Sequence, residues 1–506
     1  MTSYCSLLYL AVFLPAAVLV YRILPQRLRW VALLAASYAF FWSVSGKLLV
    51  FLLFSTVSIH YFGLWLTAEQ QDRDRRRILL FASLLQVGTL ITLKYAAFFS
   101  TNLNTLLHAL RLPVSLPVPA FLLPIGISFY TLQALSYLLD VYRGTIRADR
   151  NLARLAIFLG FFPQIMEGPI CRYGQTAQQL WEGRPVTWQG LTFGMQRILF
   201  GLIKKIVIAD RLNLLIKTVF NDYALYDGGV IALAMVCYTC QLYMDFSGTM
   251  DVVIGSAEIF GVHLPENFRQ PFFSKSIGEF WRRWHITLGT WMKDYIFYPF
   301  SLSKQMNRFG KWSKKHLGNT VGKAMPICLA DLLIFFVVGI WHGAAWKYIA
   351  YGMYNGIIIA VSSLLEPLYA KGFEKTKIHK ESKAWTVVQI IRTFILVNIG
   401  WYFDMAVSFS AALVMMKETF TKMSMSQFTG TAFLELGMGR RDFLIVLAGC
   451  IIIFIVSLLK ERGVAVREAI AAKPLIVRWA IWYAFIVIIF IFAYTGDGSA
   501  FIYANF

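Results

Sequence analysis

Two tryptophan–histidine segments hold the residue types best suited to chemistry in this sequence. The first is residues 278–288, GEFWRRWHITL, which includes His285, and the second is residues 339–346, GIWHGAAW, which includes His342. Both segments lie in or against apolar sequence. A neutral, partly desolvated imidazole is suited to take a proton from an alcohol. The pair therefore indicates acid–base chemistry on a hydroxyl group.

His342 is predicted at a tight turn between two membrane helices. It follows the apolar run Ile327–Gly339, which is broken only by Asp331, and another apolar run begins just after it. An ionisable residue within a membrane span indicates a functional site, and glycines at 339 and 343 would allow the close approach of another backbone or a ligand. The alternative is a structural histidine that bonds a carbonyl of a neighbouring helix.

His285 lies in a stretch, residues 280–298, that predicts one amphipathic helix in the membrane interface. The apolar stripe recurs at three- and four-residue steps and comprises Trp281, Trp284, Leu288, Trp291, Tyr295 and Tyr298. The polar stripe comprises Arg283, Thr287, Thr290 and Asp294. Tryptophans of such helices lie at headgroup level. His285 adjoins the apolar face and is placed to point into the protein; the alternative is an interfacial histidine with its ring half in water.

Two acids, Asp245 and Asp251, flank Ser247 near the end of a strong apolar run. Acids near the membrane bind substrates, orient histidines or cap helices; we favour a site role for Asp245 and capping or packing for Asp251. The sequence has no Gly-x-Ser-x-Gly and no glycine-rich phosphate loop, and two isolated histidines are too few for zinc. A serine-hydrolase site, nucleotide hydrolysis and a bound metal are therefore not expected.

The composition is that of an integral membrane protein. Of 506 residues, 58% are hydrophobic and only 15% are charged, against about a quarter charged in soluble domains. Long apolar runs and the absence of alternating barrel segments predict an all-α, polytopic transmembrane bundle of about eleven helices. We expect a single domain, residues 1–506, with a catalytic core at about 120–365. The Cys-x-x-Cys at Cys237 lies in an apolar run and is interpreted as packing.

The net charge of +21 is attributed to lysines and arginines in cytoplasmic loops beside anionic lipid, rather than to nucleic-acid binding. Arginines follow the first apolar run and none precedes it, which predicts a retained helix with the N-terminus outside. Basic stretches at 304–323, 371–383 and 460–478 are predicted as cytoplasmic, and stretches 100–119 and 404–438 as outside. The expected spans are Leu7–Val20, Trp30–Trp42, Lys47–Leu66, Ile78–Phe99, Phe121–Leu139, Gly228–Phe246, Ile327–Trp341, Trp346–Leu364, Val387–Phe403, Phe443–Leu459 and Trp479–Ala493.

Two further segments do not fit simple spans. Residues 161–170, FFPQIMEGPI, are too short to cross and contain two prolines and Glu167. Irregular backbone at membrane depth persists only inside protein or beside water, so a re-entrant segment that lines a cavity is favoured over an interfacial loop. Residues 195–214 mix apolar residues with charged ones, Arg197, Lys204, Lys205 and Asp210 among them. They predict a surface helix or a buried helix with ion partners.

Four segments together resemble the membrane-bound O-acyltransferase family. They are LPIGISFYTLQ at 123–133 with DVYRG at 140–144, FFPQ at 161–164 with GPI at 168–170, QLYMDFSG at 241–248, and FWRRWH at 280–285 with WHG at 341–343. They stand in the family's order and cover roughly residues 1–365. The chain most resembles the branch of bacterial alginate O-acetylase membrane subunits and related polysaccharide O-acetyltransferases.

The resemblance implies a helical bundle around a central cavity, with interfacial and re-entrant helices. It implies that His342 is the central catalytic residue and His285 a second functional histidine. The substrate-binding residues that we expect beside them are Trp341, Trp284, Arg282, Arg283, Tyr243, Asp245, Ser247 and Gln241. Two positions depart from the family pattern: Thr249 stands where an aromatic residue is frequent, and Asp404 where an arginine is frequent.

By resemblance, the protein transfers an acyl group, expected to be acetyl, across the cell's inner membrane. The donor would be a cytoplasmic thioester, acetyl-coenzyme A or an acylated carrier protein, with no bound cofactor. The acceptor would be an extracytoplasmic polysaccharide, and an SGNH-like acetyltransferase outside the membrane would be the partner. The alternatives are D-alanyl transfer to teichoic acid and, in another class, a transporter of lipid or polysaccharide precursors. Transporters commonly show repeated halves, and no internal repeat is evident.

Overall fold

The computed structural model describes residues 3–376, 379, 381–424, 426–428, 436–494 and 496, and within these ranges the fold is helical. The β-structure found there is one isolated antiparallel bridge between Phe268 and Trp284. The all-α prediction is confirmed. The chain forms two compact units, one made of Met1–Lys205 with Phe246–Pro265, and the other of Ile206–Asp245 with Glu266–Ser499.

Helices that could cross a membrane confirm a multi-pass membrane protein. By length and composition, seven in the described part of the chain qualify, or up to eight if a bent pair, Trp346–Leu364 with Glu366–Lys375, counts as one span. A shorter apolar helical segment, Leu8–Ile23, lies near the start. The predicted number of about eleven is not confirmed by this count.

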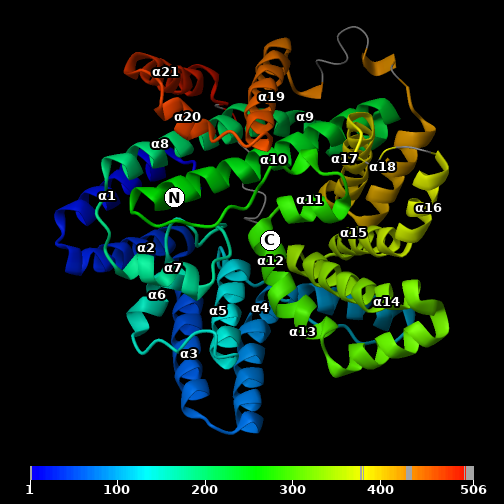
Figure 1. Cartoon of the computed structure of the whole chain (residues 1–506), viewed down its shortest axis with the longest axis horizontal. Helices are drawn as coiled ribbons and strands as arrows, with labels where there is room; N and C mark the ends of the chain where they lie inside the picture. Colours follow the sequence, from blue (N-terminus) through cyan, green and yellow to red (C-terminus); the bar gives the residue numbers. More distant parts are fainter. Residues whose placement is uncertain are drawn as a thin grey trace. The chain divides into compact units, whose positions relative to one another are not determined.

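The first unit is built from the amino-terminal helices and one end of a long helix, α10. Helices α3, α4 and α5 pack against one another, and Figure 1 draws them side by side in blue and cyan. Gly63 of α3 allows this packing, because a Cβ there would lie 3.0 Å from the Tyr137 ring of α5. The helices are α1 (Leu14–Ile23), α2 (Arg29–Ser45), α3 (Leu49–Ala68), α4 (Asp72–Ala109), α5 (Ile127–Tyr142), α6 (Leu152–Gly160), α7 (Tyr173–Trp181), α8 (Trp188–Leu202) and α10 (Gly228–Ile259).

Residues 161–170 form an irregular, fully buried stretch between α6 and α7. Part of its backbone is satisfied from outside the stretch: the Tyr4 hydroxyl donates to the Phe162 carbonyl (2.8 Å) and accepts from the Met166 N–H (3.1 Å), and the Phe162 N–H donates to Ser37 Oγ (3.1 Å). Buried backbone requires such partners. The predicted irregular structure is confirmed; its role in lining a cavity stays a prediction.

A buried ion cluster joins the end of α8 to α10 within the first unit. Asp251 pairs with Arg197 (3.0 Å) and with Lys204 (2.5 Å), and Lys204 also donates to Ser247 Oγ (3.2 Å). Gly201 permits the contact, since a Cβ there would lie 2.4 Å from the Gly248 carbonyl oxygen. Ion partners for the charged helix are therefore confirmed. Capping by Asp251 was wrong, because Asp251 lies inside α10 and compensates two cations.

The second unit contains both tryptophan–histidine segments. Its helices are α9 (Asp210–Asn221), part of α10, α11 (Ile277–Arg283), α12 (Ile286–Met292), α13 (Tyr298–Ser301), α14 (Lys304–His342), α15 (Trp346–Leu364), α16 (Glu366–Thr376), α17 (Lys383–Met405), α18 (Phe409–Thr421), α19 (Arg440–Glu461), α20 (Val466–Ala471) and α21 (Leu475–Phe492). Two π-helical segments, Ile203–Ala209 and Lys293–Phe297, precede α9 and α13 respectively. Helices α14 and α15 make the most extensive helix–helix contact.

Helix α14 folds back on itself at Gly318, which has a left-handed backbone (φ 78°). A Cβ at Gly322 would lie 2.5 Å from the backbone of Lys314, eight residues earlier, whereas eight residues of straight helix rise about 12 Å. The basic stretch 304–323, which we predicted as a loop, is therefore mostly helix. The stretches 100–119, 371–383 and 404–438 likewise contain helical residues, of α4, α16 and α18. Charge indicates contact with water and does not exclude helix.

Candidate functional site

His285 lies at a break between two short helices, not within one continuous helix as predicted. Helix α11 ends at Arg283 and α12 begins at Ile286, and His285 has a left-handed backbone (φ 46°, ψ 51°). A non-glycine residue in this region costs about 1–3 kcal/mol and persists only where its surroundings impose it. Histidine tolerates the region better than most residues. The period of the apolar stripe gave no sign of this break.

The segment that imposes the break is 267–269. The Asn267 carbonyl accepts from the Ile286 N–H (3.0 Å), and its side-chain Oδ1 accepts from the Thr287 N–H (3.0 Å) and hydroxyl (2.7 Å). The Arg269 N–H donates to the Arg283 carbonyl (2.9 Å). These bonds clamp the chain on both sides of His285. The role of Asn267 depends on tertiary contacts and had no signal in the sequence.

The break turns His285 into the protein. Its side chain is 2% exposed, and Trp284, Leu288 and Trp291 are equally buried. The alternative of an interfacial histidine half in water was therefore wrong, whereas the placement of the tryptophans at headgroup level stays a prediction. Burial, together with the neighbouring His342, lowers the pKa of His285 from 6.5 to about 3. The ring is thus neutral near pH 7, with one donor and one acceptor nitrogen.

His342 is the last residue of α14 and is 5% exposed. Glycines let α15 cross close to this end: a Cβ at Gly339 would lie 2.5 Å from the Tyr348 carbonyl oxygen, and one at Gly352 would lie 2.1 Å from that of Phe335. A Cβ at Gly343 would lie 2.4 Å from the Tyr348 ring. The predicted turn and the predicted close approach at 339 and 343 are confirmed.

Trp341 lies in contact with both histidines. Its ring centroid is 5.8 Å from that of His285 and 5.3 Å from that of His342, with edge-to-face geometry in each case. His342 also packs edge-to-face on Tyr351 (5.5 Å) and stacks on Tyr348 (6.4 Å). The two imidazoles, far apart in sequence, therefore contact one cluster of aromatic rings. We call this cluster, which includes Trp341, Tyr348 and Tyr351, the aromatic wall.

The aromatic wall continues from Tyr351 toward the other predicted residues. Tyr351 stacks on Trp401 (5.3 Å), Trp401 contacts Trp284 (5.5 Å), and Trp284 contacts Tyr243 (6.1 Å). Trp284, Trp341 and Tyr243 therefore belong to one series of ring contacts that reaches both histidines. Trp401 and Tyr351 were missed; both lie in apolar spans, where nothing in the sequence distinguished them from packing residues.

A polar network connects three helices of the same unit. The Tyr238 hydroxyl of α10 donates to Asp404 Oδ2 of α17 (2.6 Å), and Lys347 of α15 donates to the carbonyls of Asp404 and Ala406 (2.9 Å each). Lys347 also lies 4.6 Å from the centroid of the Tyr348 ring, which stacks on His342. Asp404, noted as a departure from the family pattern, is therefore a buried acid with partners. An ionisable Lys347 at the start of an apolar run was the signal available.

Not every predicted substrate-binding residue joins this cluster. Arg283 pairs with Glu279 (2.8 Å) and Glu461 (2.7 Å), and Arg282 is exposed. Ser247 belongs to the first unit and accepts from Lys204. Gln241 and Asp245 of α10 are buried, 3% and 0% exposed. Substrate contact by any of these residues stays a prediction. In the described part of the chain, no group of three or more His, Cys, Asp or Glu could hold a metal ion.

The fold is that of a polytopic membrane protein with two buried histidines in contact with one tryptophan, Trp341. Residues 51–401 match the model of the membrane-bound O-acyltransferase family. The chain belongs to this family and is an acyltransferase. A probable alginate O-acetylase of Azotobacter vinelandii is 33% identical over 408 residues, 79% of this chain and 74% of that relative.

Two further relatives differ in the group or acceptor that they are named for. A peptidoglycan O-acetyltransferase of Helicobacter pylori is 29% identical over 449 residues, 81% of this chain and 78% of its own. A teichoic acid D-alanyltransferase of Bacillus subtilis is 30% identical over 286 residues, 55% of this chain and 67% of its own. The similarity therefore extends over relatives that transfer different groups.

Proposed function

We propose that this protein transfers an acetyl group from a cytoplasmic thioester to a hydroxyl group, for O-acetylation of an extracytoplasmic polysaccharide. The observation that carries the proposal is the pair of buried histidines in contact with Trp341. The names of the relatives support the polysaccharide, since they act on alginate and peptidoglycan. The donor is acetyl-coenzyme A or an acylated carrier protein, a co-substrate rather than a bound cofactor.

In the proposed step, His342 is the general base. It takes the proton of the acceptor hydroxyl while the oxygen bonds to the thioester carbonyl carbon. The carbon–sulfur bond then breaks, and His342 returns the proton to the departing thiolate. His285, neutral because of its lowered pKa, donates a hydrogen bond to the carbonyl oxygen as negative charge develops there. Burial favours both tasks, because water would compete for these bonds.

The proposed topology places the donor and acceptor on opposite sides of the inner membrane, with the N-terminus outside. The basic arm of α14, which carries Lys304, Lys311 and Lys315, would face the cytoplasm and attract the phosphates of coenzyme A or an acidic carrier. An extracytoplasmic SGNH-like acetyltransferase would complete the transfer to the polysaccharide. Gln241, Tyr243 and Asp245 are proposed to contact substrate from α10.

The test is acetyl transfer by purified protein in vesicles supplied with labelled acetyl-coenzyme A or acetylated carrier protein. We expect His342→Ala to lose at least about a hundredfold in transfer, the lower range for a general base, with unchanged insertion and thermal stability. His316→Ala is the matched control, because His316 is an exposed histidine of the same helix. Transfer by His342→Ala above a few per cent of wild type would remove His342 from the catalytic role.

The second candidate is D-alanyl transfer to teichoic acid from a charged carrier protein. It is favoured by the teichoic acid D-alanyltransferase relative. Parallel assays with acetyl and D-alanyl donors separate the two proposals. Acetyl transfer without D-alanyl transfer supports the first, and the reverse result supports the second.

A further inference from the structure

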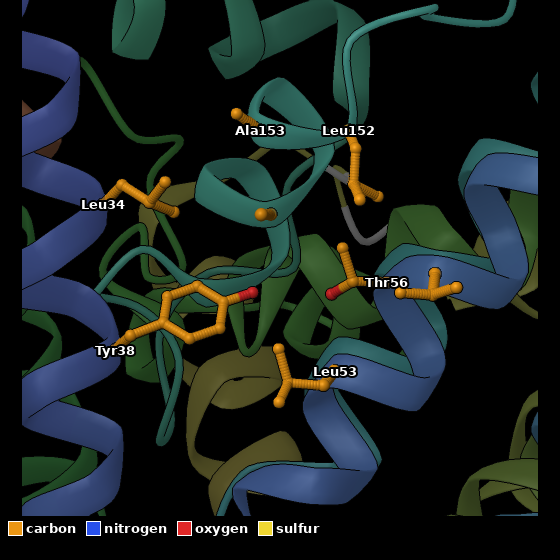
Figure 2. A pocket seen from close by; sticks show the side chains of 8 residues that line it. Leu34, Tyr38, Leu53, Thr56, Leu152 and Ala153 are labelled. Atoms are coloured by element: carbon orange, nitrogen blue, oxygen red, sulfur yellow. The ribbon is translucent and has the colours of Figure 1, made fainter.

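An apolar groove of about 420 Å³ lies in the first unit, and none of its lining residues takes part in the proposed reaction. Helix α6 packs against both α2 and α3, and the groove lies between the three. Figure 2 shows the lining side chains pointing toward one another across it. They are Leu34, Tyr38, Leu53, Thr56, Val57, Leu152, Ala153 and Ala156.

The groove offers few polar partners to water. Its two hydroxyls belong to Tyr38 and Thr56, and Figure 2 shows them facing each other. The Thr56 hydroxyl also donates to the Leu52 carbonyl (2.8 Å) within its own helix. A buried water needs two to four polar partners, and apolar cavities stay dry or bind apolar ligands. The volume falls in the range of about 300–1,000 Å³ for small-molecule sites.

The surroundings of the groove identify its occupant as hydrocarbon. Helices α2 and α3 both belong to the candidate membrane span Gln26–Ala68. Leu53 and Val57 at the groove are 43% and 39% exposed on the surface of α3. In a membrane-spanning helix, such exposed aliphatic side chains face lipid. The molecules that can enter from that side are the acyl chains of the bilayer.

A cationic stretch lies next to one end of the groove. Leu152, the first residue of α6, lines the groove, and exposed Arg147 and Arg150 precede it closely in the chain. Arg150 is two residues from Leu152, within about 7 Å along the chain. Asp149, the acid of this stretch, pairs with Arg154 (3.7 Å). The remaining cations are placed to attract a phosphate at the membrane surface.

We propose that this groove binds one acyl chain of an anionic phospholipid, whose phosphate lies at Arg147 and Arg150. Chain and headgroup recognition come from adjacent parts of the fold: α2, α3 and α6 enclose the chain, and the segment before α6 binds the charge. The site shares no residue with the proposed reaction, whose histidines, His285 and His342, belong to the other unit, so its test does not depend on that reaction.

The test uses the full-length protein in phosphatidylcholine vesicles that contain a phosphatidylglycerol probe with a photoactivatable diazirine in its acyl chain. After irradiation, adducts are mapped by mass spectrometry. We expect them to concentrate in residues 34–38, 53–57 and 152–156. Adducts spread evenly over the lipid-facing surface of α3 and α4 would overturn the proposal.

Two sets of variants make the test specific. Ala156→Trp fills the groove and should lower these adducts at least fivefold, whereas Val50→Trp, at an exposed position of α3 (58% exposed), should not. If Ala156→Trp does not give folded protein, the smaller Ala156→Leu takes its place, and undiminished adducts with it would contradict the groove.

Arg147→Gln with Arg150→Gln should reduce labelling by the phosphatidylglycerol probe and not by a phosphatidylcholine probe. Equal labelling by both probes in wild type would overturn the anionic headgroup.

Discussion

At the scale of single residues, His285 combines a strained backbone with a buried polar ring, and each of these features lowers the stability of the fold. Its backbone is left-handed and its ring is buried. Each feature is held by partners outside its own helices, the first by Asn267 and the second by the aromatic wall around Trp341. Strain and burial at one position are typical of functional sites.

The lowered pKa of His285 makes stability depend on pH. The unfolded histidine titrates near 6.5 and the folded one near 3, so between these values the unfolded state binds a proton that the native state does not. The stabilisation is complete above pH 6.5 and is lost as the pH falls, with a limiting slope of about 1.4 kcal/mol per pH unit. We expect His285→Gln to flatten this loss in thermal unfolding between pH 6.5 and 4.

The comparison needs a control because other groups titrate in the same range. His316→Gln replaces an exposed histidine and should leave the wild-type slope unchanged. Parallel pH profiles for wild type and His285→Gln would contradict the burial of a neutral ring at this position.

Tyr238→Phe tests the polar network of Tyr238, Asp404 and Lys347. It removes the hydroxyl that donates to Asp404 at 2.6 Å, and it leaves a buried carboxylate oxygen without that donor. The expected loss is about 1–3 kcal/mol in unfolding free energy, measured by thermal unfolding in detergent. Tyr402→Phe is the control, since Tyr402 bonds the neutral hydroxyl of Thr419 (2.8 Å) and its loss should be smaller. Equal losses would show that the bond from Tyr238 to Asp404 contributes no more than a bond between two hydroxyl groups.

At the scale of elements, hydropathy could predict helices wherever the membrane itself determines them. Spans such as α17, α19 and α21 must supply about 20 apolar residues, and their predicted ranges agree with the structure to within a few residues. The break at His285 could not be predicted, because its cause is a bond network to Asn267. The partner of Lys204 is likewise 47 residues away, at Asp251. The sequence therefore located both histidines but not the geometry that unites them.

The crossing of α14 and α15 gives a prediction about glycine. Gly→Ala inside a helix usually stabilises by about 0.5–1 kcal/mol. At Gly352 the added Cβ would lie 2.1 Å from the Phe335 carbonyl oxygen, so α15 would have to move away from α14. Because His342 and Tyr351 lie on these two helices, we expect Gly352→Ala to lower both the melting temperature and acyl transfer. Gly88→Ala on α4, where a Cβ meets nothing within 4 Å, should lower neither.

At the scale of the whole molecule, the excess of positive charge is the property from which the orientation of the chain is predicted. The net charge of +21 is concentrated in stretches that flank the spans, and lysines and arginines remain on the cytoplasmic side during insertion. The structure changes what these stretches are, since the arm of α14 before Gly318 is helix rather than loop. The lysines of that arm are exposed, so the prediction that the arm lies in the cytoplasm still holds for a helix.

The orientation can be tested with single introduced cysteines and a membrane-impermeant maleimide on intact cells. Ser115→Cys lies in an exposed stretch of low charge, and Lys311→Cys in the basic arm of α14; both positions are exposed. We expect labelling above the wild-type background at 115 in intact cells, and at 311 only after permeabilisation. Equal labelling of both in permeabilised cells controls for reactivity. Labelling at 311 in intact cells would place the basic arm outside, and a cytoplasmic thioester could then not be its ligand.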